Sequence, residues 1–407
     1  MILSVSDKAG IADLAGQRVN WHSLPQPFYS DATVFEADLE AIFARNWIML
    51  GFECEIATPG SYLAQTIGRT PVMVTRSAGG EVVGLLNTCR HRGAQICPDG
   101  SGRVGRLVCP YHQWSYQLDG RLIAARQMGP DFDPASHALR RIPVEVVAGC
   151  IYVCLSPEAP DFAPFRAALE PALLPHGLTN GKVVHTEVLA EQANWKLVME
   201  NGRECYHCAA RHPQLRHAFA ADIGEGQAFY DRQAETDFMD RMRQVGLGQP
   251  YLAGEWWQVG RIPMLPGVVS FALDGQSLVR RRLTDLAGGD VGSLRWAIEP
   301  NNFCHSSGDC AVMINAFPVS PTQTTVIAKW LVHKDAVEGV DYEMPRLIEM
   351  WDQTNRQDRD LAENNQRGVI GRGYVPGPYS PEAERFVNDF ASWYVARVSD
   401  WAKASEG

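Results

Sequence analysis

Long apolar runs are missing from this chain. No stretch approaches the ~20 consecutive apolar residues that a membrane-spanning helix needs. The first fifteen residues also lack the basic region followed by an apolar stretch that marks a secretory signal peptide. We therefore expect a cytoplasmic protein with no membrane partner.

An excess of positive charge is missing as well. The 37 basic residues are outnumbered by 47 acidic ones, which gives a net charge of -10. This balance argues against nucleic acid or an anionic lipid surface as a partner. Ten cysteines in 407 residues are too sparse for a disulfide scaffold, and most are expected to be small buried apolar side chains.

Two short patterns look functional but lack the context they need. Gly100-Ser-Gly-Arg-Val-Gly105 matches the dinucleotide fingerprint, yet no helix is predicted to follow it. Cys205-x-x-Cys208 has the spacing of a redox pair, but no βαβ pattern surrounds it. Neither is therefore interpreted as a nucleotide or redox site.

The most informative feature is a pair of mixed cysteine and histidine motifs. Cys89-Arg-His91 and Cys109-Pro-Tyr-His112 supply two thiolates and two imidazoles. A Rieske [2Fe–2S] cluster uses this ligand set, with two histidines on one of its irons. A zinc site accepts the same ligands, but it usually pairs Cys with Cys and His with His. The mixed arms therefore favour the iron–sulfur cluster.

A second metal site is indicated further along the chain. Glu204 and His207 are three residues apart and share one face of a helix, whereas His207 and His212 are five apart. Both histidines can bind one metal only if the helix breaks between them. A third, anionic ligand would complete the triad of non-haem Fe(II) oxygenases. Spacing alone leaves three candidates in one late helix: Asp358, Asp360 and Glu363.

The order of predicted elements suggests an α+β protein. Short strands alternate with Gly/Pro turns over residues 47–157, which is typical of a small all-β domain. Residues 158–407 begin with a Pro-rich linker, which a strand and a helix over about 195–210 follow. A run of strands comes next, including 268–273 and 277–282, and two long helices close the chain. Strands without βα alternation predict an antiparallel sheet gripping a helix. Residues 1–46 are an N-terminal segment that we expect to pack on this catalytic domain.

The two metal motifs together resemble the oxygenase (alpha) component of Rieske non-haem iron oxygenases, over nearly the whole chain. In that family an aspartate follows an acid or amide and precedes a glutamate and a glutamine, so the resemblance selects Asp358, with Glu363 and Gln366 after it. It implies a Rieske domain beside a helix-grip catalytic domain, assembled as a homotrimer. It also implies that Glu204 bridges to the cluster of a neighbouring subunit. A separate reductase with FAD or FMN and an iron–sulfur centre would supply electrons from NAD(P)H.

Several segments are similar to the branch of this family that acts on quaternary amines such as glycine betaine, choline and stachydrine, those acting on glycine betaine most of all. They are Glu204, residues 330–342 and residues 376–380. The implied reaction is O₂-dependent oxidation of an N-methyl group, giving the demethylated amine and formaldehyde. The alternatives are an aromatic-ring-hydroxylating Rieske oxygenase, an electron carrier without oxygenase chemistry and a helix-grip ligand-binding protein.

Candidates for the substrate pocket rest on residue type. A quaternary ammonium group cannot donate a hydrogen bond, so its pocket is expected to use aromatic faces. Tyr206, Trp256 and Trp257 are the candidates for such a cage. Asn201, three residues before Glu204, is a candidate for a group that supports the iron ligands.

Overall fold

The computed structural model describes residues 3–219, 232–284, 286 and 289–404. Its larger part is built on a seven-stranded antiparallel sheet in the order β12-β18-β17-β16-β15-β14-β13. The strands span β12 Gly181–Glu191, β13 Leu252–Ala253, β14 Trp257–Ile262, β15 Ser293–Ile298, β16 Asn302–Ser306, β17 Ala311–Ser320 and β18 Gln323–His333. The mixed helix-and-sheet class expected from the sequence is confirmed.

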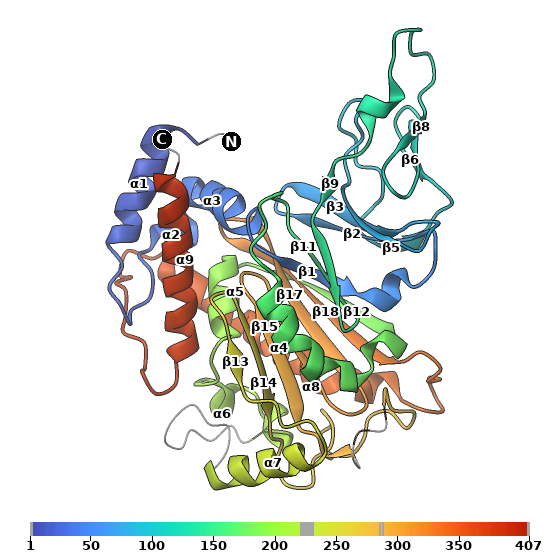
Figure 1. Ribbon diagram of the computed structural model, residues 1–407. Helices are drawn as coiled ribbons and strands as arrows, with labels where there is room; N and C mark the ends of the chain where they lie inside the picture. Colours follow the sequence, from blue (N-terminus) through green and yellow to red (C-terminus); the bar gives the residue numbers. More distant parts are fainter. Residues whose placement is uncertain (1–2, 220–231, 285, 287–288, 405–407) are drawn as a thin grey trace.

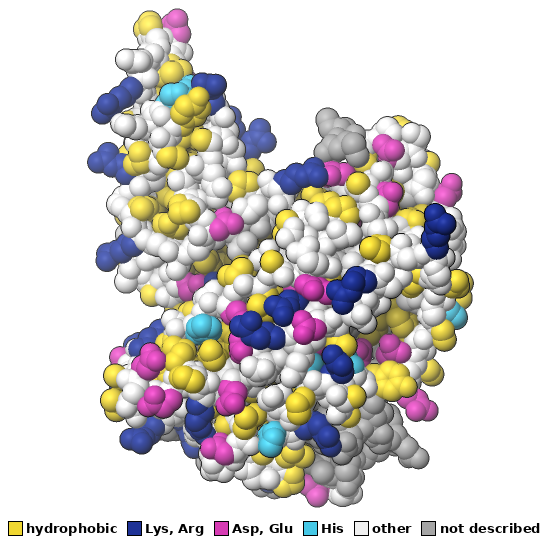
Figure 2. All heavy atoms as spheres, turned by 180° about the vertical axis from the view of Figure 1, so that it is seen from behind, with side chains coloured by type: hydrophobic (Ala, Val, Ile, Leu, Met, Phe, Trp, Pro, Cys, Tyr) yellow, Lys and Arg dark blue, Asp and Glu magenta, His cyan; other side chains and the backbone are white. Residues whose placement is uncertain are grey.

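The cluster domain is a separate lobe that rises from this body (Figures 1 and 2). A five-stranded sheet in the order β5-β2-β3-β4-β9 forms its base, and a three-stranded sheet, β6-β7-β8, forms its tip. These strands are β2 Ser61–Ile67, β3 Thr70–Arg76, β4 Val82–Leu86, β5 Gly100–Arg103, β6 Leu107–Val108, β7 Ser115–Tyr116, β8 Leu122–Ala124 and β9 Arg141–Ile142. In the view of Figure 2, Lys and Arg side chains lie along the outer edge of the lobe.

A third sheet connects the two parts. It has the order β1-β11-β10, with bounds β1 Ile48–Phe52, β10 Val144–Val147 and β11 Cys150–Val153. Every residue of β1 and β11 is buried. Their side chains belong to the same apolar core as the large sheet, whereas the cluster lobe has a smaller core of its own.

Helices cover the large sheet. They are α1 Val5–Gly16, α2 Pro27–Ser30, α3 Ala32–Ala37, α4 Ala163–Leu173, α5 Trp195–Asn201, α6 Cys208–Arg211, α7 Arg232–Gln244, α8 Met344–Val369 and α9 Arg385–Lys403. Of these, α6 and α8 position the ligands expected for the second metal. In Figure 1, α9 stands beside α1, so both ends of the chain lie on one side of the body. None of the described helices combines the length and the apolar character that crossing a membrane requires.

The N-terminal segment is anchored through a buried carboxylate. Asp38 opens a π-helical turn over residues 38–43, and its side chain is fully buried. It accepts hydrogen bonds from the indole Nε1 of Trp195 (2.8 Å) and the hydroxyl of Tyr394 (2.6 Å), and it pairs with the ammonium of Lys196. One side chain thus joins the segment to both α5 and α9.

The expected strands over 268–273 and 277–282 are wrong. This region forms loops whose polar groups converge on the buried carboxylate of Asp309. Asp309 accepts hydrogen bonds from the hydroxyls of Ser270 and Ser277 and from the amides of Leu278 and Val279. The amides that a neighbouring strand would pair are thereby satisfied by one side chain.

Candidate metal centres and active site

The two arms of the cluster motif face each other at the tip of the lobe. Cys89 and His91 follow β4, and Cys109 and His112 lie between β6 and β7. Both cysteines are buried, at 3% and 1% exposure. The Nδ1 atoms of the two histidines are 3.1 Å apart. Two sulfurs on the inside and two imidazole nitrogens toward the surface fit a Rieske cluster, whose two irons have different ligands.

Neighbouring aromatic side chains hold these arms in place. The hydroxyl of Tyr116 lies 3.3 Å from the sulfur of Cys89 and accepts a hydrogen bond from the amide of Arg90 at 3.1 Å. The ring of His91 stacks on Trp114, with centroids 4.9 Å apart and planes 9° apart. These contacts fix the position of both a sulfur and an imidazole of the first arm.

The second motif lies where a helix breaks. The continuous helix expected over 195–210 is wrong: α5 ends at Asn201, and α6 begins only at Cys208. Gly202 packs directly on Phe303, since a Cβ at this position would be 2.7 Å from that ring. The break brings the Nε2 atoms of His207 and His212 to 3.0 Å from each other, the convergence that one metal requires.

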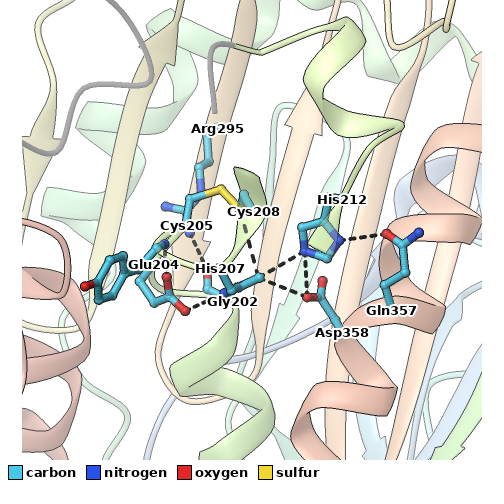
Figure 3. The surroundings of a disulfide bond; sticks show 10 residues. Gly202, Glu204, Cys205, His207, Cys208, His212, Arg295, Gln357 and Asp358 are labelled. Carbon is cyan, nitrogen blue, oxygen red and sulfur yellow. Dashed lines mark hydrogen bonds and ion pairs between the residues drawn. A yellow bond between two sulfur atoms is a disulfide. The ribbon is translucent and has the colours of Figure 1, made fainter. Parts of the chain in front are cut away.

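Asp358 on α8 meets both histidines (Figure 3). Its Oδ1 lies 3.2 Å from Nε2 of His207 and 3.0 Å from Nε2 of His212. Asp360 instead pairs with Arg359 and is 61% exposed, and Glu363 accepts a hydrogen bond from the amide of Gln192. Of the three candidates, only Asp358 completes the set of two imidazoles and a carboxylate that binds non-haem iron.

Two oxygen atoms orient the histidines. Nδ1 of His207 lies 2.5 Å from Oε1 of Glu204, and Nδ1 of His212 lies 2.8 Å from Oε1 of Gln357. Each Nδ1–H can donate to its oxygen, which leaves Nε2 free for a metal. Burial works against the charged form of His207, but its hydrogen bonds to Asp358 and Glu204 outweigh burial and raise its pKa to about 9. Gln357 was not assigned this role from the sequence, although its place before Asp358 was noted.

A disulfide between Cys205 and Cys208 closes the turn beside the site (Figure 3). This corrects the expectation that these two cysteines are separate apolar side chains. The sulfur of Cys208 lies 3.9 Å from Nε2 of His207, so it is close enough to be considered as a ligand together with both histidines. A sulfur in a disulfide is not a thiolate, however, and Asp358 is the better third ligand.

A narrow cavity lies between the large sheet and the helices α5 and α8, the second of which carries Asp358. Asn201 lines it, at the position proposed for a group supporting the iron ligands. The buried carboxyl of Glu191 also lines it, and burial together with the nearby Asp358 carboxylate raises the pKa of Glu191 to about 8. The full lining is Glu191, Val198, Asn201, Gly202, Phe303, Ile314, Val326, Asn355, Asp358 and Ala362. Glu191, Phe303 and Asn355 could not be found from the sequence because they come from separate elements.

The expected aromatic cage is not assembled. Tyr206 is 58% exposed. Trp256 and Trp257 both contact Phe165 of α4, at centroid distances of 5.4 and 5.8 Å. None of these three is among the described residues that line the cavity. The adjacent tryptophans serve the packing of α4 on the sheet.

Other aromatic side chains gather next to the cavity. The ring of Trp351 on α8 lies 4.7 Å from that of His305 on β16 and 5.5 Å from that of Phe271. Phe303, two residues from His305 on the same face of β16, has its ring 6.4 Å from the imidazole. Burial holds the pKa of His305 well below its usual value, so this imidazole is neutral.

Comparison with known proteins agrees with both metal centres. Residues 46–145 match the Rieske [2Fe–2S] domain, and residues 178–400 match the catalytic domain of the ring-hydroxylating alpha subunit. The glycine betaine monooxygenase oxygenase subunit of Pseudomonas aeruginosa is 42% identical over 95% of this chain and 91% of its own length. The corresponding subunit of Chromohalobacter salexigens is 43% identical over 94% of this chain and 87% of its own length.

Solved structures show the same fold. A quaternary ammonium Rieske monooxygenase in complex with an inhibitor superposes with a TM-score of 0.73 at 21% identity, covering 96% of this chain and 98% of its own. Naphthalene 1,2-dioxygenase from Rhodococcus sp. superposes with a TM-score of 0.68 at 19% identity, covering 97% of this chain and 98% of its own. The chain therefore belongs to the Rieske non-haem iron oxygenases, as an oxygenase alpha subunit with a [2Fe–2S] domain and a mononuclear iron domain.

Proposed function

We propose that this protein is the oxygenase component that removes an N-methyl group from a quaternary amine, with glycine betaine as the substrate. The observation that carries the proposal is the likeness, over 95% of the chain, to glycine betaine monooxygenase oxygenase subunits. The carnitine monooxygenase oxygenase subunit of Acinetobacter pittii is 31% identical over 51% of this chain and 57% of its own length. Both relatives act on amines with a quaternary nitrogen and a carboxylate.

The residues present fit the metals that this chemistry needs. Cys89, His91, Cys109 and His112 would hold the cluster, which supplies single electrons. His207, His212 and Asp358 would hold the iron, which activates O₂. Oδ1 of Asp358 is buried and lies 3.2 Å from Nε2 of His207 and 3.0 Å from Nε2 of His212. Two imidazole nitrogens and a carboxylate oxygen that converge on one point form the ligand set of non-haem iron, which supports a metal at this position.

The chain's own side chains would prepare the reaction. Glu204 and Gln357 hold the imidazoles so that Nε2 points at the iron position. Asn201 and Phe303 bound the cavity in which the substrate methyl group would lie. One oxygen atom of O₂ enters a C–H bond of that group, and the other leaves as water with two electrons and two protons. The N-hydroxymethyl product then releases formaldehyde and a proton and becomes the demethylated amine.

Electrons are proposed to arrive from a partner protein. A flavin- and iron–sulfur-containing reductase would oxidise NAD(P)H and reduce the cluster, which is why we also propose a cytoplasmic location. We further propose a homotrimer in which Glu204 connects His207 to a cluster histidine of a neighbouring subunit. Two features support this route: Glu204 already contacts His207, and His112 is exposed at the tip of the lobe. Inter-subunit electron transfer is also described for a structurally similar quaternary ammonium Rieske monooxygenase.

The test is a substrate panel with the reconstituted protein. Purified protein with iron, a compatible reductase, NAD(P)H and O₂ is assayed for formaldehyde with glycine betaine, choline, carnitine and proline betaine. Benzoate is the control for ring hydroxylation. Formaldehyde that matches NAD(P)H consumption with glycine betaine supports the proposal. If no amine yields formaldehyde although the cluster is visibly reduced, quaternary amines are rejected as the substrate class.

A further inference from the structure

Two N–H donors without partners lie on the face of α8 that carries Asp358. They are Nε1 of Trp351 and Nδ2 of Asn355, neither of which has a hydrogen-bond partner in the described part of the chain. The spacing i, i+4, i+7 places Trp351, Asn355 and Asp358 one above another on the helix. Trp351 is 5% exposed and Asn355 4%. Asp358 faces the two histidines as a proposed metal ligand, whereas the two donors have no such neighbours.

One of the two donors lines the cavity beside the iron ligands, and the other lies one helical turn beyond it. Asn355 and Asp358 both line the cavity, opposite Phe303. Trp351 lies one helical turn further from Asp358 and packs on His305, the neighbour of Phe303 on the same face of β16. The face of α8 thus runs from an acidic end at the metal position to an end with two unpaired N–H donors.

Leaving such donors unpaired in a buried site is costly, and a ligand that accepts from them removes the cost. We propose that Asn355 and Trp351 bind the carboxylate of a zwitterionic quaternary amine, which turns its N-methyl group toward His207, His212 and Asp358. The inference rests on the proposed function and adds to it the group that orients the substrate. A carboxylate accepts at both oxygens, so it can satisfy both donors.

The rest of the cavity suits the cationic end. The ammonium group carries no N–H, and it needs only negative charge or aromatic faces around it. The carboxylate of Asp358 and the ring of Phe303 provide these. An aromatic hydrocarbon, in contrast, offers no acceptor for the two donors.

The test compares two ligands that share a cation and differ in the carboxylate. Calorimetric binding of glycine betaine and tetramethylammonium is measured on the iron-loaded protein for the wild type, Asn355→Asp and Trp351→Phe. Asn355→Asp places a negative charge where the carboxylate would bind, and Trp351→Phe keeps a ring but removes the N–H. We expect each change to weaken glycine betaine binding by about tenfold or more. Neither change should weaken the binding of tetramethylammonium, because this ligand has no carboxylate to lose its donors.

Asn364→Asp is the matched control, because it makes the same change at an exposed position of α8 and should leave both affinities as they are. Iron content and the visible spectrum of the cluster show that each variant is loaded and folded. The inference is overturned if neither variant weakens glycine betaine binding, or if both ligands lose affinity equally. The failure of this inference can be told apart from failure of the proposed function. If the wild-type protein demethylates glycine betaine and both variants bind it equally well, only the carboxylate site is rejected.

Discussion

At the scale of single residues, the iron site depends on which atoms the histidines present. Nδ1 of each ring faces an oxygen, Oε1 of Glu204 or Oε1 of Gln357, and both Nε2 atoms face Oδ1 of Asp358. The residue types could be predicted from the sequence. The partner of His212 could not, because Gln357 lies 145 residues away from it and nothing in the local pattern joins them.

Replacing Asp358 tests the proposed iron site independently of the cluster. Asp358→Ala removes the only charged ligand of the triad, so we expect mononuclear iron to be lost and turnover to stop. The cluster, held by another domain, should keep its visible spectrum. Metal analysis of the purified variant measures the change, with Asp360→Ala, an exposed acid two residues on, as the control. Full iron content and activity in Asp358→Ala would move the third ligand elsewhere.

Replacing Glu204 distinguishes electron transfer from metal binding. Glu204→Gln keeps the size of the side chain and an oxygen for Nδ1 of His207, but removes the charge. We expect both metals to remain bound while turnover falls severely, because the proposed electron route passes through this carboxylate. Single-turnover reduction of the iron site by a pre-reduced cluster measures the step directly. Unchanged rates would remove Glu204 from the route.

At the scale of elements, strands were predicted well where apolar residues form simple runs. Residues 47–157 contain the short strands that the sequence predicts, among them Val82–Leu86 and Leu107–Val108. The prediction failed where tertiary contacts decide the backbone. The loops around Asp309 have strand-like composition, yet one carboxylate binds their amides. The end of α5 was also missed; Gly202 at this point packs against the ring of Phe303, which comes from a distant strand.

The break after α5 can be tested with a single methyl group. In Gly202→Ala, the added Cβ would lie 2.7 Å from the ring of Phe303, so the helix end or the ring must shift. We expect a loss of about 1–3 kcal/mol in unfolding free energy and weaker iron binding, since His207 and His212 depend on this break. Gly368→Ala on α8 is the control, because its Cβ meets no atom within 4 Å. Thermal melting and iron content measure both effects.

At the scale of the whole molecule, the N-terminal segment depends on one buried charge. Asp38 neutralises Lys196, and both side chains are fully buried. Asp38→Asn would leave the ammonium without a charged partner, so we expect a loss of about 3–5 kcal/mol of stability. Asp13→Asn, at an exposed position of α1, is the matched control. Chemical denaturation measures the difference, and equal stability of the two variants would show that contacts other than the Asp38–Lys196 pair hold the segment.

The proposed homotrimer allows the strictest test of the electron route. A Cys89→Ser variant should lack the cluster, an Asp358→Ala variant should lack the iron, and each alone should be inactive. If electrons cross between neighbours, a trimer co-assembled from both variants regains activity wherever an intact cluster faces an intact iron site. Random mixing in equal amounts makes about a quarter of the interfaces productive. Transfer within one subunit predicts no activity at any ratio, because no subunit then carries both metals. Formaldehyde release from co-expressed variants therefore decides whether electrons cross between subunits or stay within one.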